Sequence, residues 1–208
     1  MILLRHPELD PRFASIAVGD GEAALGRRGQ AQVMAWLELL DSVPISTIYC
    51  APSPQCVDPA RALAARKQIN VEEDPRLNDQ NMGAWQGRPW EDIVKTDGDA
   101  LREFFAEFGE SAPPGGESLG QSVERMLSWW QAVAPDALQK TLLVITSGSM
   151  ISGFATALLG IRLSRCVSLN LPHGGMGILD CFANGARITS WNPTALSGLV
   201  SPEGEGPA

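Results

Sequence analysis

The amino-acid sequence predicts an α/β domain built on a mostly parallel central sheet of about six strands. Short apolar runs rich in β-branched residues alternate with segments of helical periodicity, an order typical of parallel sheets. One run, Leu142-Leu143-Val144-Ile145, is apolar at every position and therefore resembles a central strand covered on both faces. With 208 residues, of which 44% are hydrophobic, the chain is long enough for one domain with a sizeable core.

The predicted strands are short, and turn residues lie between them. They span residues 1–5, 47–50, 69–72, 141–146, 176–182 and 187–191. Ala183-Asn184-Gly185 separates the last two, which predicts a β-hairpin.

Helices are expected over residues 25–40, 59–67, 118–134 and 149–160. Ser118 and Gln121 have the spacing of a capping box at the start of the third helix. Glycine and proline at 112–116 predict a loop before it. The tail over 193–208 is rich in Gly, Pro and Glu, and we expect it to be disordered.

The charge balance restricts the partners of the protein. Asp and Glu total 24 against 16 Lys and Arg, so the formal net charge is -8. Nucleic acids and anionic membranes select basic surfaces, so we expect neither as a partner and expect a small-molecule ligand instead. The apolar start is too short for a signal peptide or a membrane span, and the four cysteines form no CxxC pair. The sequence thus favours a soluble, cytoplasmic protein, and it leaves the oligomeric state open.

The chain has only two histidines, and both lie near predicted strand ends. His6 follows Arg5 at the end of the first strand, the edge of an open α/β sheet where ligands bind. His173 lies in a glycine-containing loop before a late strand. Both are candidate functional residues.

Several segments occur in an order typical of one protein family. They read LLRHPE at 3–8, IYCAP at 48–52, RL at 76–77 with GAWQG at 83–87, GGES at 115–118 and LVITSG at 143–148. The chain resembles the histidine phosphatase superfamily, the phosphoglycerate mutase-like group, and looks most like its α-ribazole phosphatase-type members. This resemblance implies a three-layer α/β/α domain over 1–192, with an insert or lid over roughly 76–134.

The resemblance also implies a mechanism. A neutral histidine attacks phosphorus and forms a phosphohistidine, which water then hydrolyses. Two arginines and a second histidine hold the phosphoryl oxygens, and a carboxylic acid protonates the leaving alkoxide. No metal or cofactor is implied.

Three residues match this scheme. Arg5 corresponds to the first phosphate-binding arginine, and His6 corresponds to the nucleophile. Asp79 stands four residues before Gly83, where the family has its acidic glutamate, and its side chain is one methylene shorter.

Two positions depart from the scheme. Gln55 stands where the second arginine is expected, and a one-residue shift of the alignment places Cys56 there instead. Arg61 lies further along the predicted helix. Ser147, followed by Gly148, stands where the family has its second histidine, and Ser147 is also a good helix N-cap. Neither departure supplies a positive charge.

His173 has two interpretations. It lies where the chain of the family passes close to the phosphate pocket, so it is a candidate to compensate for the histidine missing at Ser147. It is alternatively a loop histidine bonded to the backbone. A serine hydrolase built on Ser147 is a further alternative, but the sequence lacks the glycine that a nucleophile elbow carries two residues before its serine.

Three functional hypotheses follow from this degenerate pocket. The first is a weak or altered phosphatase that acts through His6 on a small metabolite. The second is an enzyme of another reaction class, in which His6 and Asp79 move protons on a weakly charged substrate. The third is a non-catalytic pseudophosphatase that binds a ligand. The insert contains Trp85, Trp90 and the Phe104-Phe105 pair, which predicts an enclosed, partly aromatic cleft, although the two tryptophans are better suited to packing.

Overall fold

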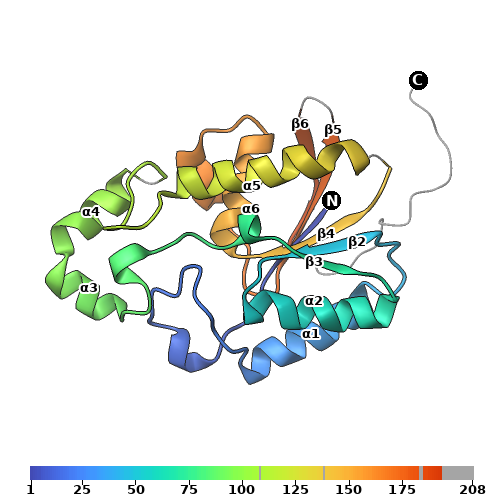
Figure 1. Cartoon of the computed structure of the whole chain (residues 1–208), viewed down its shortest axis with the longest axis horizontal. Helices are drawn as coiled ribbons and strands as arrows, with labels where there is room; N and C mark the ends of the chain where they lie inside the picture. The colour runs from blue at the N-terminus through green and yellow to red at the C-terminus, as the bar shows by residue number, and fades with distance from the viewer. Residues whose placement is uncertain (108, 138, 183–184, 194–208) are drawn as a thin grey trace.

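The sheet has six strands: β1 (Ile2–Arg5), β2 (Thr47–Cys50), β3 (Val71–Glu73), β4 (Leu142–Thr146), β5 (Met176–Phe182) and β6 (Gly185–Trp191). Their order is β3-β2-β4-β1-β5-β6 (Figure 1). The first four strands of that order run parallel, β5 is antiparallel to β1, and β6 is antiparallel to β5. The computed structural model describes residues 1–107, 109–137, 139–182 and 185–193.

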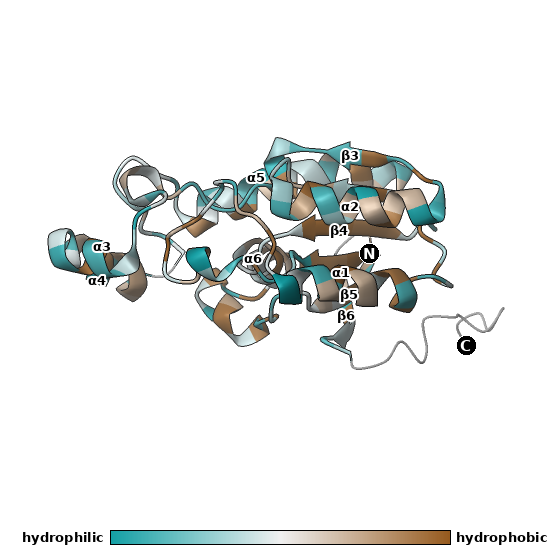
Figure 2. Cartoon of the chain, turned by 90° about the horizontal axis from the view of Figure 1, so that it is seen from below, coloured by the Kyte–Doolittle hydropathy of each residue, from teal (hydrophilic) through white to brown (hydrophobic). Residues whose placement is uncertain are grey.

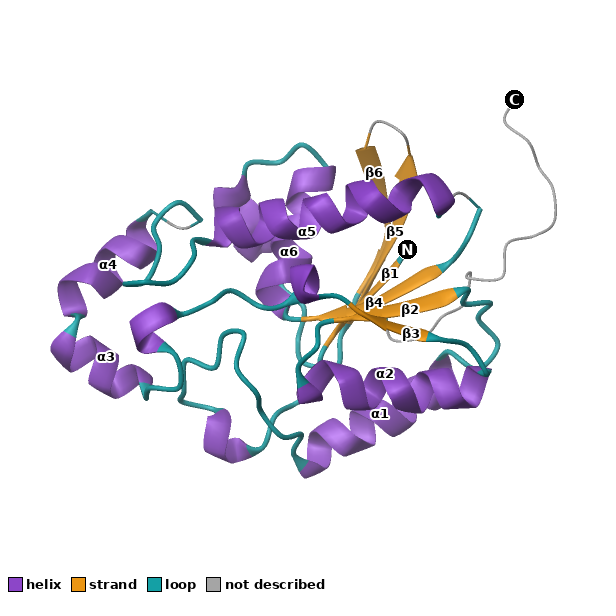
Figure 3. Cartoon of the chain, viewed as in Figure 1, coloured by secondary structure: helices purple, strands orange, loops and turns teal. Residues whose placement is uncertain are grey.

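Four helices cover the sheet: α1 (Arg27–Leu39), α2 (Pro54–Lys67), α5 (Leu119–Val133) and α6 (Gly148–Leu158). The helices α1 and α2 lie on one side of the sheet and α5 and α6 on the other (Figure 3). Every residue of β4 is buried, as the apolar run in the sequence predicts, and the strand appears brown between its neighbours in Figure 2. The three-layer, mostly parallel α/β architecture is therefore confirmed.

The remaining helices lie in the insert and in the loops. The helices α3 (Trp90–Thr96) and α4 (Gly98–Ala106) project at one end of the molecule (Figure 1). Short 3-10 segments are η1 (Pro11–Phe13), η2 (Pro75–Leu77), η3 (Gly83–Trp85), η4 (Ala134–Asp136) and η5 (Leu163–Leu169). The insert has a small core, made by Met82, Trp85, Ile93, Leu101 and Phe104 together with Ala17 from the loop after β1.

The prediction of a partly aromatic cleft in the insert is wrong, because none of the four aromatic residues on which it rests lines the cavities next to His6. Trp85 is fully buried and packs edge-to-face on Phe104, with 5.5 Å between the ring centroids. Trp90 lies against Phe105 at 6.5 Å, on the other side of the same cluster. Burial of Trp85 and Phe104 in this cluster stabilises the insert.

Several element boundaries differ from the prediction. The helix predicted from Pro59 begins at Pro54, because proline at the first helical position is favourable and Pro59 is accommodated one and a half turns later, inside the helix. The third strand spans Val71–Glu73 and not 69–72. The capping box of Ser118 and Gln121 is confirmed, and so is the pairing of β5 with β6. The tail predicted to be disordered spans 193–208, and residues 194–208 of it lie outside the described residues.

In the described part of the chain, no single helix is long and apolar enough to cross a membrane, although α6 and η5 pass that test when taken together as a pair bent by 119°.

Candidate active site

The predicted site residues gather at the carboxyl edge of the parallel strands. Arg5, the last residue of β1, is the register partner of Thr146, the last residue of β4. The His6 backbone N–H donates to the Thr146 carbonyl at 2.9 Å. His6 and Ser147 therefore leave neighbouring strands side by side, at the edge where open α/β sheets bind ligands.

His6 is held as a neutral imidazole. Its Nδ1 lies 3.0 Å from the carbonyl oxygen of Pro7. Because a carbonyl only accepts, Nδ1 carries the proton, and the lone pair is on Nε2. Burial, which leaves the residue only 8% exposed, lowers the pKa of His6 to about 4, opposed mainly by this backbone hydrogen bond. At neutral pH the ring is thus in its nucleophilic form.

Arg5 is fixed by two acceptors. Its Nη1 donates to the Leu171 carbonyl at 2.6 Å, and its Nη2 donates to Nε2 of His173 at 3.0 Å. Desolvation lowers the pKa of Arg5, but an arginine stays charged. The guanidinium crosses Gly148 so closely that a Cβ there would lie 2.9 Å from Nε. Because glycine has no Cβ, residue 148 does not clash with the Arg5 side chain.

His173 contacts both residues. Since Arg5 only donates, Nε2 of His173 accepts, and Nδ1 is left to donate to the His6 carbonyl at 3.4 Å. The two imidazole rings lie 5.0 Å apart. Burial and the nearby Arg5 charge lower the pKa of His173, so it too is neutral. Both of its nitrogens are used, which makes it a support for Arg5 more than a second phosphate ligand.

Asp79 lies beside Ser147. Its Oδ1 accepts from Ser147 Oγ and Ser149 Oγ, each at 2.6 Å, and from the Gln80 backbone N–H at 2.8 Å. Among the residues that the structure describes, Oδ2 has no hydrogen-bond partner. A proton carried on Oδ2 is therefore compatible with all three of these bonds.

Ser147 is the N-cap of α6, as predicted, because its Oγ accepts from the Met150 backbone N–H. Its hydroxyl donates to Asp79 and lies 2.9 Å from Ser149 Oγ, and it is not hydrogen-bonded to a histidine. The arrangement that a serine hydrolase needs, a serine bonded to a histidine base, is therefore not formed.

The side-chain amide of Gln55 is hydrogen-bonded to the loop at 21–23. Its Oε1 accepts from the Ala23 backbone N–H at 3.0 Å, and its Nε2 donates to the Gly21 carbonyl at 2.8 Å. An arginine could not accept from Ala23, so the amide is better suited to this contact than the family residue. Cys56 is buried in the core beside it, and Arg61 bonds to Glu73 on the exposed face of α2.

Two cavities meet at this site. One, of about 340 Å³, is lined by Arg5, His6, Asp79, Ser147, Gly148, Ser149, Ser152, Cys166, Val167 and Asn170. The other, on the Gln55 side, has only about 30 Å³ and also contains Asp20. A space of that size holds about two water molecules. A ligand therefore enters on the side of Arg5 and Asn170.

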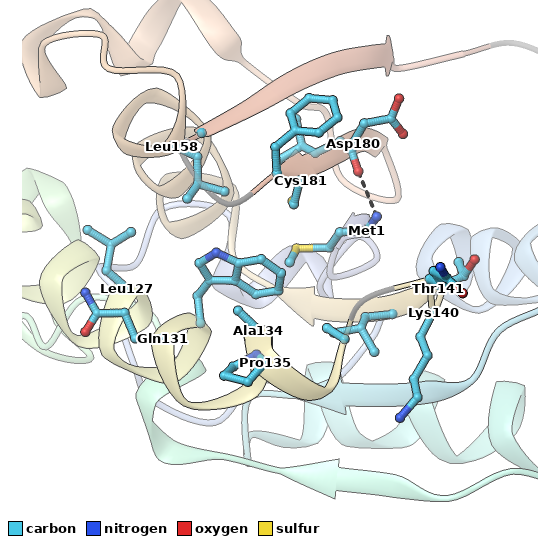
Figure 4. A pocket seen from close by; sticks show the side chains of 17 residues that line it. Met1, Leu127, Gln131, Ala134, Pro135, Lys140, Thr141, Leu158, Asp180 and Cys181 are labelled. Carbon is cyan, nitrogen blue, oxygen red and sulfur yellow. Dashed lines mark hydrogen bonds between the residues drawn. The ribbon is translucent and has the colours of Figure 1, made fainter. Parts of the chain in front are cut away.

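A larger cavity of about 710 Å³ lies at the opposite end of the sheet, between α5 and β5 (Figure 4). Its lining includes Met1, Trp130 and Leu179 but none of the predicted site residues. In the described residues, no group of three or more His, Cys, Asp or Glu side chains could hold a metal ion.

Sequence reasoning missed Ser149 and Asn170. Ser149 had a usable signal, since a second hydroxyl in the first turn of a helix can face the same site as its N-cap. Asn170 had none, because its place depends on how η5 packs on α6.

Comparison with known proteins identifies the family and the fold. The model of the histidine phosphatase superfamily (branch 1) matches residues 1–194. A glucosyl-3-phosphoglycerate phosphatase of Mycobacterium tuberculosis is 27% identical over 97% of this chain and 86% of its own. An adenosylcobalamin/alpha-ribazole phosphatase of Escherichia coli is 21% identical over 93% of this chain and 96% of its own. The crystal structure of an alpha-ribazole phosphatase from Shigella flexneri has a TM-score of 0.86 at 20% identity, covering 93% of this chain and 96% of that one.

Proposed function

The chain belongs to the histidine phosphatase superfamily, and from this we propose that it is a phosphatase-type enzyme of low efficiency, acting through His6 on a small phosphorylated metabolite. One observation carries the proposal. Neutral His6, with its Nδ1 bonded to Pro7, has its Nε2 lone pair available at the wall of the 340 Å³ cavity, where Arg5 and Asp79 also lie.

In the proposed reaction, Nε2 of His6 attacks phosphorus, the N–P bond forms and the ester P–O bond breaks. Arg5 stabilises charge on the non-bridging oxygens. A proton on Oδ2 of Asp79 passes to the leaving oxygen, and the resulting carboxylate takes a proton from the water that attacks the phosphohistidine. That second step releases phosphate and restores neutral His6.

Low efficiency follows from the missing charges. Losing one charge-assisted donor to a transition-state oxyanion costs about 10²–10³ in rate. Here Gln55 and Ser147 replace two such groups, and the losses of neighbouring groups are not additive. Fold and rate are separate properties, so the intact scaffold does not restore the rate.

A non-catalytic binding protein is a second candidate. The engagement of the Gln55 amide with Gly21 and Ala23 supports it, because this contact closes the part of the pocket where the family binds phosphate oxygens. The remaining hypothesis, an enzyme of another reaction class that uses His6 and Asp79, stays a prediction.

The test is turnover of p-nitrophenyl phosphate and a panel of sugar and nucleotide phosphates by the intact chain and by His6→Ala. We expect slow turnover that His6→Ala abolishes, together with a phosphoryl adduct on His6 in mass spectra of alkali-quenched protein. Circular dichroism establishes that the variant is folded. Turnover that survives in His6→Ala contradicts the proposal, and so does a complete lack of both turnover and adduct.

A further inference from the structure

We propose that the site prefers a singly charged phosphodiester to the dianionic phosphate monoester. The inference deepens the proposed function and rests on it. What carries it is the juxtaposition, around His6, of a single cation, Arg5, with the proton donor Asp79 and an otherwise uncharged wall.

The charges around the two cavities can be counted. Among the residues that the structure describes, Arg5 is the one lysine or arginine in the lining of either cavity. Asp79 borders both cavities, and Asp20 borders the smaller one. A phosphate monoester carries about two negative charges at neutral pH, and a diester carries one. A single cation therefore matches the diester, whereas the second charge of the monoester has no cation to meet.

The neutral donors do not make up the deficit. The hydroxyl protons of Ser147 and Ser149 are both directed at Oδ1 of Asp79. The amide group of Gln55 is bonded to the loop at Gly21 and Ala23. The polar groups of these three side chains are therefore used in hydrogen bonds within the protein. None of them offers a charged partner to the additional negative oxygen of a monoester.

The uncharged lining of the 340 Å³ cavity suits a second ester group. Beyond His6 and Arg5 its wall continues over Ser152, Cys166, Val167 and Asn170, which carry no charge. Ser152 donates its hydroxyl proton to the Leu169 carbonyl at 2.7 Å, so even this group is satisfied internally. A neutral organic substituent on the third oxygen lies against such a wall at lower desolvation cost than a charged oxygen does.

The chemistry balances for a diester. Nε2 of His6 forms a bond to phosphorus, one ester P–O bond breaks, and the proton on Asp79 leaves with the alcohol. The intermediate is a phosphohistidine that keeps the second ester group. Water then breaks the N–P bond, Asp79 regains its proton, and the product is a phosphate monoester.

Binding tests the charge preference without turnover. Phenylphosphonate and its monomethyl ester differ by one methyl group and one charge at about pH 8. We expect the intact chain to bind the singly charged ester at least about tenfold more tightly in calorimetry, because unmatched like charge is costly in a closed site. Asn170→Lys adds a cation to the wall and should reduce this preference by about tenfold, with Asn170→Gln as the neutral control. Equal or tighter binding of the dianion overturns the inference.

Turnover separates this inference from the proposed function. We expect bis(p-nitrophenyl) phosphate to be hydrolysed with the larger acceleration over its spontaneous rate, and His6→Ala to abolish the reaction. Monoester turnover that depends on His6 but exceeds diester turnover on this scale leaves the proposed function standing and overturns the diester preference. Lack of turnover of both, with no adduct on His6, overturns both.

Discussion

The two sides of the site differ although the same sheet edge positions both. On the β1 side, Arg5 and His6 have the residue types and the contacts that phosphoryl transfer needs. On the α2 side, Gln55, which the sequence alignment places where the family has its second arginine, bonds to the loop at 21–23. The strands fix where side chains stand, and the side chains decide the chemistry, so one half of a site can change while the fold stays.

The largest effect is expected on the β1 side. Among the described residues that line the 340 Å³ cavity, Arg5 is the one lysine or arginine. Arg5→Gln removes its charge, so kcat/KM should fall by about 10²–10³. Arg61→Gln is the matched control, because Arg61 pairs with Glu73 on an exposed face of α2 and should leave turnover unchanged. If the two variants behave alike in steady-state kinetics, the difference between the two sides is not catalytic.

The reverse experiment is on the α2 side. Gln55→Arg together with Ser147→His adds two basic groups and should raise kcat/KM for p-nitrophenyl phosphate by about 10². The same change removes the acceptor for the Ala23 N–H, so the free energy of unfolding should fall by about 1–3 kcal/mol in urea denaturation. An inert but folded double variant would show that the pocket is remodelled beyond these two residues.

His6 also makes stability depend on pH. Its pKa is about 4 in the folded protein and 6.5 as the ordinary value, so between these limits the unfolded chain binds more protons. The free energy of unfolding should therefore fall by up to about 3 kcal/mol as pH drops from 6.5 to 4. Denaturation of His6→Gln over the same range should give a shallower slope, and an unchanged slope would assign the effect to other groups.

The sequence could predict the half of the site that is local along the chain. Arg5 and His6 end a strand, Ser147 caps a helix directly after the apolar run of β4, and both features are read from consecutive residues. The hydrogen bonds of the Gln55 amide were not predictable. Its partner Gly21 lies far away in the sequence and offers only backbone atoms. Backbone acceptors are the same for every residue type and leave no pattern in the sequence.

The packing of the insert also depends on contacts between residues that are distant in the sequence. Its aromatic residues suggested a partly aromatic cleft, which is not formed, whereas the prediction that Trp85 and Trp90 serve packing is confirmed. Trp85 and Phe104 meet across two separate segments, η3 and α4, and that pairing turns them away from His6. Composition predicts that aromatic side chains will be buried somewhere, and only the packing shows where.

Gly148→Ala tests how tightly Arg5 is held. The new Cβ would stand 2.9 Å from Nε, and the guanidinium, fixed by Leu171 and His173, would have to move. We expect turnover to fall about tenfold, because the displaced guanidinium no longer lies where it meets the phosphoryl oxygens. Gly98→Ala is the matched control, since Gly98 also begins a helix but has only the end of a flexible side chain nearby, at 3.8 Å. Equal activity of both variants would mean that Arg5 adapts freely.

The smallest effect is expected at His173, which supports Arg5 and packs on His6. His173→Ala removes one acceptor of Arg5 and should lower kcat/KM several-fold, and His173→Gln, which keeps an acceptor, should restore part of the loss. The chain has two histidines, so in either variant the one imidazole signal in NMR belongs to His6. Burial and the neighbouring His173 both lower the pKa of His6, so removing His173 should raise that pKa from about 4 toward 6.5. A His6 pKa that stays low while activity is unchanged would show that His173 is a loop residue bonded to the backbone and takes no part in preparing the β1 side of the site.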